Sequence, residues 1–227
     1  MPLFSTLDLV ALAWFLGAWA VYSITLSSTE RRRHGLNSEM HRYREVWMLQ
    51  MLGRDMRMVD AQIVAALQNG TAFFASTSLI AIGGALTLLR SSRELLQVIA
   101  ALPFGDRMTP VQWEVKTMGL AVIFVYAFFK FAWSYRLYNY MAIMVGAAPP
   151  ATEKDSPEAK AHAARLGRLC EVAGRHFNRG QRAFFFALGY LGWFISPWLL
   201  MVTSVIVAGV MWRRQFASDS RRALLNE

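Results

Sequence analysis

The sequence is dominated by long apolar runs that contain almost no charge. A helix needs about 20 mostly apolar residues to cross the hydrocarbon core of a bilayer. Residues 9–29, 61–89 and 183–212 form three uncharged runs of that length, and residues 117–135 form a fourth that contains only Lys130. Because Lys130 lies near one end of its run, its long side chain can carry the ammonium to the interface. These runs predict an all-α, polytopic membrane protein with four transmembrane helices.

We expect one integral membrane domain over residues 1–227, with spans at about residues 8–28, 63–89, 112–135 and 183–211. Core helices of soluble proteins rarely keep such runs free of charge, which argues against a large soluble domain. The first run does not have the pattern of a secretory signal, since no basic residue precedes it and Asp8 stands where a basic region belongs. We therefore expect it to be retained as a helix.

Two segments between the spans are too long for turns and have the periodicity of amphipathic helices. Apolar residues recur every three or four positions from Trp47 to Ile63, which predicts a first arm over about residues 38–62 that runs unbroken into the second span. A second arm over about residues 156–182 starts at Ser156-Pro157, a pair typical of a helix N-terminus, and leads into the last span. Because each arm has an apolar stripe, we expect the arms to pack against each other.

The basic residues are distributed unevenly between the two sides of the predicted spans. Seven arginines lie between the first two runs, and eight arginines and lysines lie between the last two. The opposite side receives Arg90, Arg93 and Arg107 in the second loop, and four arginines in the C-terminal tail. Because cytoplasmic loops are enriched in Lys and Arg, the arms are expected in the cytoplasm and both termini outside it, in the inner (plasma) membrane.

Eight polar residues in the arms and at their junctions with the spans form the candidate site. They are Asp55, Asp60, Gln68, Asn69, Arg175, Asn178, Arg179 and Arg182. Asp55 falls on the apolar stripe of the first arm, where a carboxylate needs a partner, and arginines of the second arm could supply one. The eight residues are expected either to make inter-arm contacts that hold helices together or to line a polar path for ions.

The sequence has no pattern typical of a catalytic or cofactor site. A haem inside a helical bundle needs axial ligands at membrane depth, yet His34, His41, His162 and His176 all fall outside the spans. His162 and His176 would lie about 21 Å apart along one helix, too far to bind one metal ion. Since a phosphate loop, a nucleophile elbow and zinc-ligand spacing are also missing, we expect no cofactor, no metal and no catalytic residue.

Three short stretches resemble a known family. They are Val59-Asp60-Ala61-Gln62, Phe73-Phe74-Ala75-Ser76-Thr77, and Arg175-His176-Phe177-Asn178-Arg179-Gly180 with the following Phe184-Phe185-Phe186-Ala187-Leu188-Gly189. In these residues the chain resembles the domain-of-unknown-function 599 family, integral membrane proteins of bacteria and plants, over most of its length. The resemblance implies a membrane protein and brings with it no activity, cofactor or site residue.

Two functions are compatible with these features. The first is an oligomeric channel or transporter for small ions, with anions favoured because the arms are basic. The alternative is a non-catalytic accessory or scaffolding subunit of a larger membrane complex, suggested by the methionines of the first arm, which suit adaptable contacts. A membrane enzyme acting on lipid head groups has only the basic residues in its favour. The expected partners are anionic lipids and either further copies of this chain or other membrane proteins, and not nucleic acid.

Overall fold

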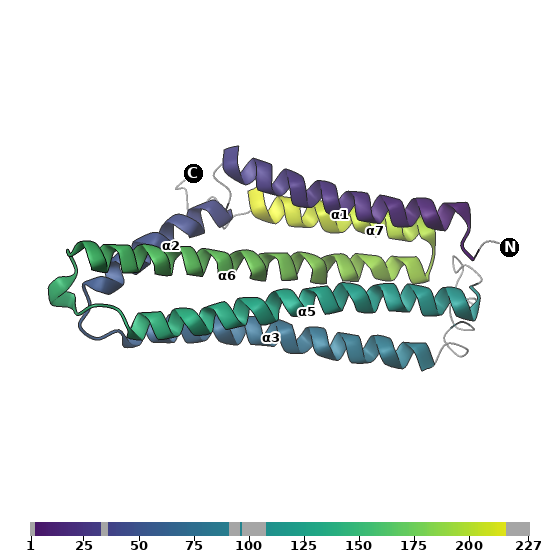
Figure 1. The fold of residues 1–227 in the computed structure, drawn as a ribbon. Coiled ribbons are helices and arrows are strands. Elements are labelled where there is room, and N and C mark those ends of the chain that lie inside the picture. The colour runs from purple at the N-terminus through teal and green to yellow at the C-terminus, as the bar shows by residue number, and fades with distance from the viewer. Residues whose placement is uncertain (1–2, 33–35, 91–95, 97–107, 217–227) are drawn as a thin grey trace. The chain divides into compact units, whose positions relative to one another are not determined.

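The computed structural model describes residues 3–32, 36–90, 96 and 108–216. These residues form six α-helices and two short 3-10 helices, without a strand (Figure 1). In chain order they are α1 (Thr6–Arg32), α2 (Leu36–Leu52), α3 (Met58–Arg90), α5 (Pro110–Gly146), η1 (Ala151–Glu153), α6 (Pro157–Tyr190), η2 (Leu191–Phe194) and α7 (Pro197–Phe216). The predicted all-α class is confirmed.

Four helices within the described residues are long and apolar enough to cross a membrane. They are Thr6–Leu26 of α1, Met58–Arg90, Pro110–Gly146 and Pro197–Phe216. Three of these coincide with predicted spans, and the fourth covers only the second half of the predicted span at 183–211. The chain therefore has the composition and helix lengths of a polytopic membrane protein.

The helices contribute to two compact units, which we describe separately. The first unit comprises Met1–Gly35, Ser78–Tyr126 and Arg182–Glu227. The second unit comprises Leu36–Thr77 and Ala127–Gln181. The first unit thus contains α1, α7 and the ends of α3, α5 and α6 that adjoin the predicted outer side, whereas the second contains most of the predicted arms.

Aromatic packing holds the first unit together. The Trp19 ring of α1 stacks on Phe186 of α6 at 5.4 Å between centroids, and Phe15 meets Phe186 edge-on at 5.8 Å. On the other side of α6, the Phe184 ring contacts Phe124 of α5 at 5.4 Å. Such pairs contribute about 0.5–1.5 kcal/mol each beyond their buried area. The end of α6 is therefore enclosed between α1 and α5.

The prediction of one continuous span over residues 183–211 is wrong, because α6 and α7 form a hairpin in the first unit. Thr203 of α7 donates its hydroxyl to the carbonyl of Gly189 at 2.7 Å. Further from the turn, the Arg214 guanidinium lies 5.7 Å from the centroid of the Phe185 ring. Residues later in α7 thus contact residues earlier in α6, so α7 turns back along the end of α6 (Figure 1).

The hairpin forms because three residues at the turn favour it. Ser196 caps α7 by accepting a hydrogen bond from the Leu199 amide at 3.2 Å, and Pro197 occupies the first helical position, where its missing N–H costs nothing. Gly192 permits the close approach, since a Cβ there would lie 2.8 Å from the Thr203 hydroxyl and 3.0 Å from the Leu199 backbone. These residues end one helix and begin another.

The second unit confirms that the arms pack together. The side chain of Met48 on α2 packs at Gly167 of α6, where an added Cβ would lie 3.9 Å from its Cγ. The core shared by α2 and α6 also includes residues of α3 and of the last eleven positions of α5. Those eleven positions lie beyond the predicted span, which ends at residue 135. The core residues are Met48, Met51, Leu52, Val64, Leu137, Tyr138, Met141, Val145, Ala159, Ala163, Leu166, Cys170 and Ala173.

The first arm is not continuous with the second span, contrary to the prediction. α2 ends at Leu52, and its last carbonyls are used by short-range bonds from the amides of Gly53 and Arg54 to Gln50 and Met51. Arg57 then fixes the turn by donating from Nη1 to the carbonyl of Ala148 at 2.7 Å and from Nη2 to that of Pro149. The second arm starts as predicted, with the Ser156 hydroxyl accepting from the Ala159 amide at 3.1 Å.

Candidate functional site

The most unusual polar feature of the first unit is a buried ion pair between α1 and α5. The Lys116 Nζ lies 3.4 Å from Asp8 Oδ1, and their exposed fractions are 2% and 8%. Lys116 also donates to the Trp193 carbonyl at 2.8 Å and lies 4.9 Å above the Trp193 ring. The Trp193 indole in turn donates to Asp8 Oδ1 at 2.8 Å. Lys116, Asp8 and Trp193 together form what we call the ionic cluster.

The remaining bonding capacity of Asp8 is used by Ser5, which directly precedes α1. Ser5 donates to Asp8 Oδ2 from its hydroxyl at 2.7 Å and from its amide at 3.3 Å, while the Asp8 amide donates back to the Ser5 hydroxyl at 3.1 Å. A buried ion pair is stable only when hydrogen bonds satisfy both charges. The ionic cluster meets that condition, so its geometry supports a structural joint between α1, α5 and η2.

The sequence alone did not single out this cluster. Lys116 directly precedes the third apolar run, and Asp8 at the start of the first run indicates only that a secretory signal pattern is missing. The available signal was the charge itself, since a lysine inside the predicted span at 112–135 needs a partner. Asp8 occupies the equivalent place at the start of α1.

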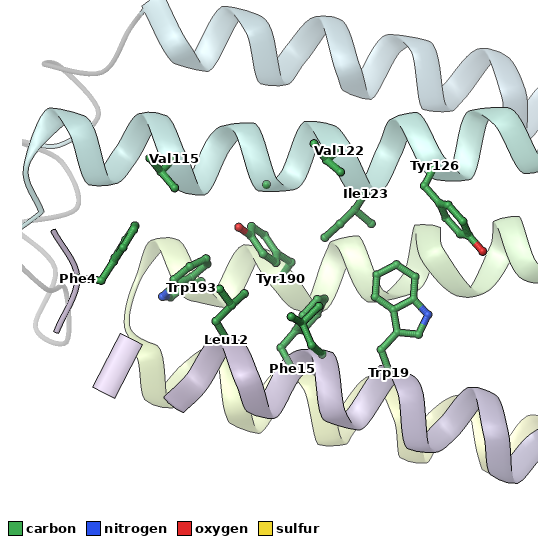
Figure 2. Close-up of a pocket in the computed structure, with 12 residues that line it drawn as sticks. Phe4, Leu12, Phe15, Trp19, Val115, Val122, Ile123, Tyr126, Tyr190 and Trp193 are labelled. Carbon is green, nitrogen blue, oxygen red and sulfur yellow. The ribbon is translucent and has the colours of Figure 1, made fainter. Parts of the chain in front are cut away.

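A pocket of about 440 Å³ lies beside the ionic cluster in the first unit. Figure 2 shows side chains of α1 and α5 facing each other across it, with Tyr190 and Trp193 between them. The walls are Phe4, Leu12, Phe15, Leu16, Trp19, Val115, Gly119, Val122, Ile123, Tyr126, Tyr190 and Trp193. Its size is within the range of small-molecule sites, about 300–1,000 Å³, and its walls are almost entirely apolar.

The predicted site residues of the second unit are partly engaged inside it. Asp60 is fully buried and accepts hydrogen bonds from Arg54 Nη1 at 2.5 Å and from the Trp47 indole at 2.7 Å. Gln68 donates to the Asn139 side chain at 2.5 Å. These contacts join α2 or its following turn to α3, and α3 to α5.

The other predicted residues are more exposed. Asp55 lies in the turn after α2 and is exposed, so its predicted position on a helical stripe is wrong. Asn69 and Arg179 are exposed, and Asn178 and Arg182 are half-buried. Arg175 is exposed and pairs with Glu171 of its own helix at 2.7 Å.

These residues do not converge on one point in the second unit. The turn containing Arg57 bonds to Ala148, just beyond the end of α5, whereas the Ser134 hydroxyl of α5 donates to the carbonyl of Ala173, two residues before Arg175. From Ser134 to Gly146, the last residue of α5, the helix advances about 18 Å. Among the described residues, one polar contact between the arms is that of His41 Nε2 of α2, 3.7 Å from Glu171 Oε2 of α6.

The comparison with known proteins decides the family. The sequence profile described as "Protein of unknown function, DUF599" matches residues 10–220. The chain belongs to the DUF599 family. No curated protein and no solved structure matches this DUF599 protein.

In this DUF599 protein the single cysteine is sequestered. Cys170 is free and lies in the core of the second unit. Burial raises the pKa of its thiol to about 11, against a smaller opposing effect of the nearby Arg44 charge. Because the thiolate is the reactive form, the thiol is unreactive in the folded protein at neutral pH. Among the described residues, no group of three His, Cys, Asp or Glu side chains is placed to hold a metal ion.

Proposed function

We propose that this protein is a non-catalytic accessory protein of the membrane that binds a partner protein through the exposed side of α2. One observation carries the proposal. Tyr43, Val46 and Leu49 recur every three residues on α2 and are 44%, 46% and 54% exposed, while Met48, Met51 and Leu52 on its opposite side are in the core. Exposed apolar stripes of this kind on soluble surfaces mark interaction sites.

The apolar surface continues past the end of α2. Met56 and Met58 follow in and just after the turn, and their side chains are 73% and 62% exposed. We call Tyr43, Val46, Leu49, Met56 and Met58 the α2 surface. Methionine side chains are flexible and polarizable, which suits a protein-binding face. The sequence-based hypothesis also assigned Met48 and Met51 to this face, and that part is wrong because both are fully buried.

The position of the turn favours a protein partner over lipid. Arg57 binds the carbonyls of Ala148 and Pro149, just beyond the last residue of α5. Gly146, the last residue of α5, lies about 24 Å along the helix from Lys130. Lys130 is the first charged residue within the apolar run. The Met56 and Met58 end of the α2 surface is therefore too far from the apolar span to be buried in the hydrocarbon core.

The same contacts reduce the support for an ion path through the predicted residues. Asp60 is enclosed by Arg54 and Trp47, and Gln68 is bonded to Asn139. These contacts resemble the hydrogen bonds that join helices in membranes, each of which contributes about 0.6 kcal/mol on average. A channel formed by several copies is the competing function, and it predicts ion flux.

Gentle detergent extraction tests the accessory role. We expect the wild type to migrate as a stoichiometric complex with a different protein, and Val46→Glu with Leu49→Glu to release it. Lys160→Glu is the control, because Lys160 is exposed on α6 rather than on α2 and the substitution changes the net charge by the same amount as the double substitution. A symmetric assembly of this chain alone, unchanged by the double substitution, or ion flux in proteoliposomes of the purified protein, would contradict the proposal.

The proposal includes a five-crossing topology in place of the expected four. The end of α6 enters the first unit, where Ala183, Phe186 and Ala187 are fully buried and so shielded from lipid, and α7 then returns alongside it. Composition does not reveal this crossing because α6 also carries Arg175, Arg179 and Arg182. With five crossings the termini lie on opposite sides.

The arginine distribution supports this topology. If α7 returns to the side of the arms, Arg213 and Arg214 in its last turn and the two arginines of the tail join the fifteen basic residues there. The three arginines of the second loop are then left on the other side. Because the cytoplasmic side carries the excess of Lys and Arg, the N-terminus is outside and the C-terminus is in the cytoplasm.

A further inference from the structure

We propose that the pocket of the first unit binds one acyl chain of a membrane lipid. Its walls come from the candidate spans α1 and α5 and from the end of α6 with η2. Two residues on its rim, Leu16 of α1 and Val122 of α5, are exposed although they belong to spans. Residues exposed on a span face hydrocarbon, so the pocket opens toward the acyl chains of the bilayer.

The shape of the pocket suits a linear hydrocarbon rather than a compact ring system. Along α5 its lining runs from Val115 to Tyr126, a distance of about 16 Å. Along α1 it runs from Leu12 to Trp19, with Phe4 at the end nearest the ionic cluster. Since it is long and almost entirely apolar, it offers dispersion contacts along a chain and few groups that could orient a polar ligand.

The inner wall is shaped by one close contact between α6 and α5. A Cβ at Gly119 would lie 2.2 Å from the Tyr190 hydroxyl, so only glycine allows the Tyr190 hydroxyl to come this close to α5. Tyr190 also packs edge-on against Phe15 and Trp193, at 5.4 Å in both cases. The ring is thereby held as a fixed wall of the pocket (Figure 2).

The ionic cluster sets the orientation of the bound acyl chain. It lies where α1 and α5 begin, so a head group belongs at that end, beside Phe4 and Trp193. The opposite end, at Trp19 and Tyr126, is about 15 Å further along α5 from Lys116, near the middle of a bilayer. A lipid from that leaflet therefore places the end of its chain at Trp19 and Tyr126.

Photolabelling in a bilayer tests this site. The full chain is reconstituted into phosphatidylcholine vesicles that contain a phosphatidylcholine with a diazirine on the terminal carbon of its palmitoyl chain. After irradiation, peptide mass spectrometry is expected to find the label concentrated on Trp19, Ile123 and Tyr126. Val205 and Ile206, which are exposed on α7, report ordinary lipid contact.

Blocking variants separate a site from general lipid contact. Val122→Trp fills the pocket from α5, and labelling of Trp19 and Tyr126 is expected to fall about tenfold because the occupant is excluded. Val125→Trp, at an exposed position of the same helix outside the pocket, should leave it unchanged. Leu16→Trp fills the pocket from α1 and replaces Val122→Trp in this experiment if Val122→Trp does not fold. Equal labelling of the pocket and of Val205 and Ile206, or labelling unchanged by either block, would overturn the proposal.

Discussion

Replacing Lys116 with methionine is expected to lower the free energy of unfolding by about 3–5 kcal/mol, the cost of removing one partner of a buried ion pair. Methionine keeps most of the apolar volume but leaves the Asp8 carboxylate buried without its cation. It also removes the bond to the Trp193 carbonyl. The measurement is reversible unfolding in mixed detergent micelles, followed by circular dichroism.

Two further variants identify the cause of that loss. Lys154→Met removes an exposed lysine and should change stability little. Adding Asp8→Asn to Lys116→Met removes the stranded charge, so the double variant should be more stable than Lys116→Met alone. If Lys116→Met were as stable as Lys154→Met, the ionic cluster would not be the joint between α1, α5 and η2 that its geometry indicates.

Leu166→Ala is expected to lower stability by about 2–5 kcal/mol, the usual cost of a cavity in a close-packed core. Leu166 is fully buried at the centre of the core of the second unit, four residues from Cys170. Because the Cys170 thiol is buried, its alkylation rate reports opening of that core. The rate should rise clearly in Leu166→Ala.

The neighbouring Leu169 provides the comparison. It packs against the same core but is only partly buried, so Leu169→Ala should cost less and speed alkylation less. Leu169→Glu should destabilise more than Leu169→Ala, since the stripe of α6 packs on α2 and not in lipid. Equal alkylation rates in the wild type and Leu166→Ala would contradict the described core.

The parts of the fold that depend on composition and periodicity could be predicted from the sequence. The uncharged runs locate α1, α3 and α5, and the stripe of the second arm locates the side of α6 that packs in the second unit. The continuation of α5 to Gly146 was not predicted, because the apolar run weakens after Tyr135. Its Tyr138 and Met141 are buried in the core shared with the arms, a long-range packing that hydropathy alone could not assign.

The hairpin was missed although its signal was present. Ser156-Pro157 correctly predicts the start of a helix, yet the identical pair Ser196-Pro197 falls inside the predicted span at 183–211. The run from 183 to 212 is long enough for one span, and that length outweighed the local capping signal. Gly192, whose missing side chain permits the close turn, could be recognised only once Thr203 was known to lie beside it.

The contacts of the candidate site could not be predicted from the sequence. The engagement of Asp60 and Gln68 depends on partners at a distance along the chain, such as Asn139, which periodicity cannot pair. The pocket depends on how α1, α5 and α6 approach one another, so no local pattern could predict it.

The side of the membrane reached by the C-terminus tests the account most directly, because the hairpin requires it to differ from that of the N-terminus. The native Cys170 is buried and unreactive, so a single added cysteine can be read with an impermeant maleimide in intact cells. Ser92→Cys in the second loop is expected to label from outside, whereas Ser38→Cys and Ser220→Cys are expected to label only after permeabilisation. Labelling of Ser220→Cys in intact cells, together with Ser92→Cys, would contradict the five-crossing topology and return the C-terminus to the outer side.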